Sequence, residues 1–146
     1  MAEHKSDQIA GQDATPVVLP KANELHGRVR VAYWSFVTPA GGVAVADTVT
    51  LVRLPRGARV LGGRFTAEAM STGAGDATME IGTEAAPARY LEATSVDAAA
   101  AGDFADSIAR AFGDPLAAET DVIATASVEA WAAGKRMDGW IAYAVD

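Results

Sequence analysis

The chain has 146 residues, the usual size of one domain, so a single hydrophobic core is expected. Its formal net charge of −7 repels a phosphate backbone, which argues against nucleic acid as a partner. Because the sequence contains no cysteine, disulfides, thiolate nucleophiles and zinc–thiolate sites are excluded.

Neither a membrane partner nor secretion is expected from the hydropathy pattern. No stretch approaches the roughly 18 consecutive apolar residues that span a bilayer. The N-terminal residues MAEHKSDQ also lack the apolar run of a secretory signal, so synthesis in a cytoplasm is expected.

Residues 1–27 are predicted to form an extended N-terminal arm that precedes one domain at 28–146. This segment holds both histidines and has no sustained apolar period. The stretch TPVVLP allows two interpretations. The arm is free, or Val17, Val18 and Leu19 dock as an added edge strand on a neighbouring subunit.

From Arg28 onward the sequence alternates as strands do. In RVRVAYWSFVT, three valines and Tyr33 share one parity, whereas Trp34 and Phe36 share the other. This pattern predicts a strand that is buried on one face and partly covered on the second.

Further strands are expected along the rest of the chain, separated by glycine and proline. A Gly62-Gly63 pair inside one of them predicts a bulge. Seven or eight short strands without an internal repeat predict an all-β fold, a single antiparallel β-sandwich or jelly roll. The predicted segments are 47–54, 58–70, 77–83, 87–93, 120–128 and 137–146.

The region 96–118 leaves two alternatives open. Phe104, Ile108 and Phe112 are four residues apart, which a helix would align on one face. A short helix and a long covering loop both fit this spacing.

The search for catalytic and metal-binding residues predicts none, and therefore no enzyme and no cofactor. His4 and His26, the usual general bases, both lie in the predicted arm. The STGAGDA stretch at 71–77 lacks the lysine of a phosphate-binding loop and is predicted to be a turn. The carboxylates at 97–121 lack the spacing of a calcium loop and indicate a solvated acidic surface.

Besides the three arm residues, four residues of the domain are candidates for a protein interface. Arg53, Arg56 and Arg59 lie close together, and arginine suits interfaces because its planar fork makes paired hydrogen bonds; an ordinary solvated strand face is the alternative. Trp131 lies in the polar stretch EAWAAGKRMDG, where an exposed ring would anchor a partner; core packing is the alternative.

Four phrases of the sequence resemble a pattern in small virion proteins of tailed phages that are encoded near the major capsid protein. They are RLPRGARVLGG, MEIGTEAAPARYLEA, LAAETDVIATAS and GWIAYAVD, and the resemblance spans roughly residues 28–146. Such proteins are commonly head decoration (cement) proteins with β-sandwich or jelly-roll folds.

The resemblance implies a non-enzymatic structural protein on the capsid surface of the virion, made in the host bacterial cytoplasm. Its implied partners are the major capsid protein and neighbouring copies of itself, as a homo-oligomer, with no substrate and no cofactor. Two alternatives stay open. One is a tail-tube, connector or head-fibre base protein. The other is a carbohydrate-binding module, for which Trp34, Trp131 and Trp140 are the candidate aromatic residues.

Overall fold

A computed structural model of the chain describes residues 14–17, 28–106 and 113–145. These ranges contain eight β-strands and no helix. The described part of the chain therefore has no helical segment that could cross a membrane. The strands are β1 (Arg28–Val37), β2 (Thr48–Leu54), β3 (Arg59–Ala67), β4 (Thr78–Thr83), β5 (Ala86–Ser95), β6 (Ala100–Phe104), β7 (Thr120–Ser127) and β8 (Arg136–Val145).

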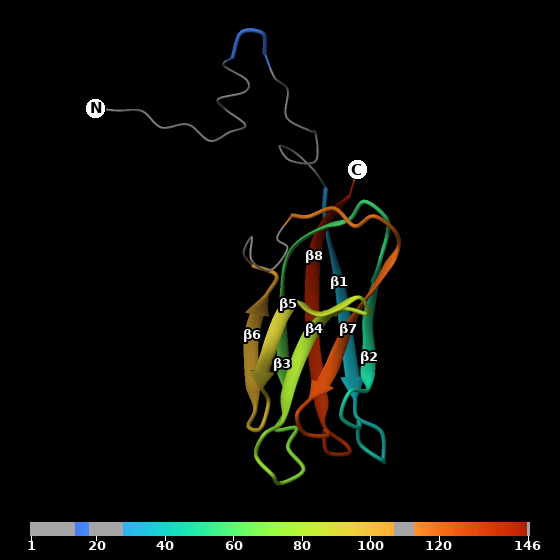
Figure 1. The fold of residues 1–146 in the computed structure, drawn as a ribbon, viewed down its shortest axis with the longest axis vertical. Coiled ribbons are helices and arrows are strands. Elements are labelled where there is room, and N and C mark those ends of the chain that lie inside the picture. The colour runs from blue at the N-terminus through green and yellow to red at the C-terminus, as the bar shows by residue number, and fades with distance from the viewer. Residues whose placement is uncertain (1–13, 18–27, 107–112, 146) are drawn as a thin grey trace, which may run out of the picture.

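The strands form two antiparallel sheets that pack as a sandwich (Figure 1). The order is β1-β8-β3-β6 in the first sheet and β2-β7-β4-β5 in the second. Strands near the two ends of the sequence pair with each other, β1 with β8 and β2 with β7. Strands from the middle of the sequence also pair with each other, β3 with β6 and β4 with β5. This wrapped hairpin is the topology of a jelly roll, which confirms the predicted fold class.

The strand positions follow the alternation in the sequence, and the glycine pair marks a bulge as predicted. The register between β3 and β8 shifts between Val60 and Gly62. Gly62 has φ of +139°, a conformation that residues with a side chain rarely adopt. By contrast, β1 pairs with β8 over ten consecutive residues without a register shift.

The core lies between the two sheets and receives side chains from both. It is rich in methionine and aromatic residues, which fill irregular space between aliphatic neighbours. The largest fully buried side chains are Trp131, Tyr90, Phe65, Phe104, Leu54, Met70, Met79, Ile81, Met137, Ile141, Val60 and Val96.

The region 96–118 contains a strand that neither alternative predicted. Ala100–Phe104 forms β6, which pairs with β3 at the edge of the first sheet, and Phe104 points into the core. Its sequence, AAGDF, has no alternation of large apolar residues. The strand therefore depends on its backbone pairing with β3 rather than on a pattern in its own sequence. Ile108 and Phe112 lie outside the described residues.

Candidate functional site

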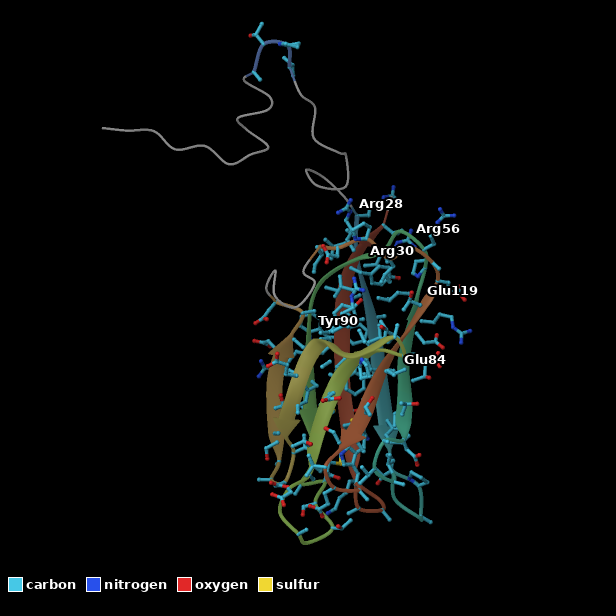
Figure 2. The ribbon with its side chains drawn as sticks, viewed as in Figure 1. Arg28, Arg30, Arg56, Glu84, Tyr90 and Glu119 are labelled. Carbon is cyan, nitrogen blue, oxygen red and sulfur yellow. The ribbon has the colours of Figure 1, made fainter. Side chains whose placement is uncertain are left out.

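One end of the sandwich carries three exposed arginines, which we call the arginine end. Arg28 and Arg30 begin β1, and Arg56 lies in the turn between β2 and β3 (Figure 2). Strand register brings them together, because Arg28 lies opposite Val145 and β3 starts opposite Ala144. Among the described residues, no hydrogen bond or ion pair engages these three guanidinium groups. The arginine end is thus an unpaired positive surface on an acidic protein.

The other arginines predicted for the interface are engaged within the chain. Arg53 makes a bidentate pair with Asp121, with Nε–Oδ1 and Nη2–Oδ2 distances of 2.6 and 3.1 Å. The hydrogen bond raises the pKa of Arg53 and lowers the pKa of Asp121. Arg59 is half-buried and donates from Nη1 to the Gly113 carbonyl at 2.8 Å. Arg53, Arg56 and Arg59 are thus close in sequence but differ in role, because Arg53 and Arg59 bond within the chain whereas Arg56 belongs to the arginine end.

An open groove of about 820 Å³ lies on the flank of the second sheet. Its charged lining mixes both signs and consists of Arg53, Arg89, Glu84, Glu119 and Asp121. Figure 2 labels the two glutamates. In the described ranges no group of three metal-binding side chains converges, here or elsewhere. The groove therefore offers charged and polar contacts of both signs.

The STGAGDA turn at 71–77 binds the carboxylate of Glu129, a residue of the same chain. Glu129, only 8% exposed, accepts hydrogen bonds from the Thr72 amide at 2.6 Å, the Asp76 amide at 3.0 Å and the Thr72 hydroxyl. The Ala74 amide and the Ser71 hydroxyl contribute longer bonds of 3.4 and 3.2 Å. With the Thr72 hydroxyl as the main cause, these donors lower the pKa of Glu129 from 4.5 to about 2.

Trp131 is buried, so the expectation that an exposed ring there anchors a partner is wrong. The residue is 1% exposed, its backbone bonds reciprocally with Val43, and its ring Nε1–H donates to the Thr78 carbonyl at 3.2 Å. An isolated bridge also connects it to Ser71. Several loops converge on this tryptophan and close the end of the sandwich opposite the arginine end.

The large exposed aromatic side chains lie instead on the outer face of the first sheet. Trp140 is 36% exposed and Tyr33 is 77% exposed, and the two are cross-strand neighbours on β8 and β1. Trp34, one residue away, is buried. With Arg64 and Asp138 they line a shallow groove of about 270 Å³.

The predicted strand-adding segment of the arm is only partly described. Val17 is exposed, whereas Val18 and Leu19 lie outside the described residues, as do His4 and His26.

No protein-family model matches the chain, and no curated protein matches its sequence. Solved structures do match it. A chain of the capsid asymmetric unit of cyanophage Pam1 is 22% identical with a TM-score of 0.69, covering 84% of this chain and 88% of that chain. A chain of the capsid of Ralstonia phage GP4 is 18% identical with a TM-score of 0.68, covering 82% and 86%.

A third similar chain comes from the acid-stable capsid of Helicobacter pylori bacteriophage KHP30, with 13% identity and a TM-score of 0.53, covering 83% of this chain and 90% of that chain. In all three cases the match covers more than four fifths of this chain and more than four fifths of the similar chain, so the likeness extends over most of the sandwich. At these identities it establishes a shared fold.

Proposed function

We propose that the chain is a non-enzymatic structural protein of a phage virion that attaches to the capsid lattice and stabilises it, as a head decoration protein does. The observation that carries the proposal is the likeness of the sandwich to chains from three phage capsid structures. Fold alone does not fix function, so the proposal also requires a surface suited to attachment.

The arginine end is that surface. Its guanidinium groups are exposed and unpaired among the described residues, and arginine is enriched where proteins bind each other. The predicted arm, residues 1–27, joins the domain at the same end, through Arg28. Arm and arginines together would contact the major capsid protein on the outside of the particle. Many weak contacts repeated over a lattice give firm attachment.

The alternatives differ from this role in measurable ways. A tail-tube, connector or head-fibre base protein would be present in few copies per particle, whereas a decoration protein follows the count of capsid subunits. A carbohydrate-binding module is less favoured, because two of its three candidate tryptophans, Trp34 and Trp131, are buried.

The proposal is tested by adding the purified protein to capsids from a phage that lacks its gene and measuring bound copies by sedimentation. We expect saturation at a number set by the lattice. The double variant Arg28→Gln, Arg30→Gln should bind about tenfold more weakly, since it removes two unpaired charges.

The matched control is Lys135→Gln, Arg136→Gln, which removes the same charge near the opposite end of the sheet, where Arg136 lies opposite Val37. It should bind like the unmodified protein. Absence of saturable binding would refute the attachment role, and equal weakening by both double variants would refute the assignment of the arginine end.

A further inference from the structure

Strand β1 is an edge strand with little of the usual protection against pairing with another chain. Protein edges are commonly blunted by short strands, bulges, proline or lysine. Among the four described edge strands, β6 has five residues, β2 has a register shift between Thr50 and Val52, and β5 has two register shifts and contains Pro87. Strand β1 has ten residues in unbroken register and contains neither proline nor lysine, and its charged residues, Arg28 and Arg30, lie only at its start.

The outer face of the same strand is mostly apolar, with Ser35 as its one polar side chain. Its exposed side chains follow the two-residue period of a strand and form a stripe roughly 27 Å long. We call this the β1 stripe, and it consists of Val29, Val31, Tyr33 and Val37, with Trp140 beside it on β8.

These five residues are between 36% and 77% exposed, and exposed apolar side chains gathered on one face often mark a site of protein association. Two arginines on strands β3 and β8 of the same sheet are paired within the chain. Arg64 bonds Asp103 at 2.7 Å, and Arg136 bonds Asp138 at 2.8 Å. Arg28 and Arg30, at the start of β1, are the only charged residues of the strand itself, although the chain carries a net charge of −7.

From these features we infer that β1 pairs with β1 of a second copy of the chain, in antiparallel orientation about a two-fold axis near Tyr33. The two first sheets then join into one sheet of eight strands. This pairing concerns the chain alone and goes beyond the proposed attachment to a capsid.

The sequence of β1 is complementary to itself in this orientation. With Tyr33 on the axis, Val29 lies opposite Val37 of the second copy and Val31 lies opposite Ser35, so valine and tyrosine side chains pack across the new pair. Arg28 and Arg30 then lie opposite Thr38 and Phe36 of the second copy, and no arginine faces another. A parallel arrangement would instead place each arginine beside its own copy, at a cost in like-charge repulsion.

The test is the association state of the full chain, measured by sedimentation equilibrium over a range of concentrations. We expect a monomer–dimer equilibrium. Tyr33→Lys should weaken dimerisation at least about tenfold, since it puts two like charges on the axis. The control Thr66→Lys adds the same charge on the exposed outer face of β3, which strand β8 separates from β1, and should leave dimerisation unchanged. Circular dichroism verifies that both variants are folded.

Engineered cysteines give a second readout, because the chain has none of its own. Mild oxidation should cross-link Tyr33→Cys into a dimer and leave Val29→Cys monomeric, since position 29 is far from the axis. A monomeric unmodified protein, or dimerisation insensitive to Tyr33→Lys, would overturn the inference. A monomer that binds a glycan array through Tyr33 and Trp140 would overturn it in favour of a sugar-binding face.

Discussion

Replacing Trp131 with alanine should destabilise the domain far more than replacing Trp140. Trp131 is 1% exposed, and a tryptophan this deeply buried hides roughly 200 Å² of surface. At about 25 cal/mol per Å², that burial is worth about 5 kcal/mol, of which alanine retains a part. We therefore expect a loss of about 3–5 kcal/mol in the free energy of unfolding, or roughly 10–15 °C in Tm.

Trp140→Ala is the matched control, since the same atoms are removed from the outer face of the sheet. Its ring is partly exposed and water can occupy the space, so about 1–2 kcal/mol is expected. Trp131→Phe separates packing from polarity. It keeps most of the apolar area but loses the bond to the Thr78 carbonyl, for about 1–2 kcal/mol. Urea unfolding followed by circular dichroism measures all three. Equal losses for the two alanine variants would refute the assignment of Trp131 to the core.

Three further results are expected. The pKa of Glu129 is lowered from 4.5 to about 2, so its stabilisation is complete above about pH 4.5 and is lost as the pH falls toward 2. Glu129→Gln should therefore lower Tm at pH 7 and flatten the fall of Tm between pH 5 and pH 2, whereas exposed Glu84→Gln should change neither. Gly82→Ala would place its Cβ 2.2 Å from the Ala86 carbonyl oxygen and should cost about 1–3 kcal/mol in chemical denaturation, whereas Gly41→Ala meets nothing within 4 Å. Deletion of residues 1–27 should leave the far-UV circular dichroism and Tm nearly unchanged but weaken capsid binding in the sedimentation assay.

Each of these has an outcome that would contradict it. For Glu129, it is a variant whose Tm falls with pH as steeply as that of the unmodified protein. For Gly82, it is a loss no larger than that of Gly41→Ala. For the arm, it is either an unfolded truncation or one that binds capsids as strongly as the full chain.

The alternation of apolar and polar residues was sufficient to predict the sandwich, because most strands bury one face. It failed for β6, whose sequence AAGDF carries one large apolar residue, Phe104. In β1 both faces carry large apolar side chains, so the sequence could not tell which one points inward. The structure buries the Trp34 face and leaves the Tyr33 face exposed.

The candidate site was harder to predict because it depends on contacts between distant segments. Trp131 stands among polar residues, and only the convergence of separate loops buries it. Glu129 bonds the Thr72 amide across 57 positions of sequence, a distance at which spacing carries no signal. The sequence places Arg28 and Arg30 at the start of a predicted strand but does not show that they lie next to Arg56. That position follows from the register of β1 and β3 with β8.

The central claim, that the chain is a lattice-bound virion protein, is tested most directly by cryo-EM reconstruction of particles from the producing strain beside particles in which its gene is deleted. The account predicts that regularly repeated density on the outside of the capsid, fitted by the jelly roll with its arginine end toward the shell, is present in the first sample and missing from the second. An unchanged lattice, with density lost only at the tail or at one vertex, would contradict it.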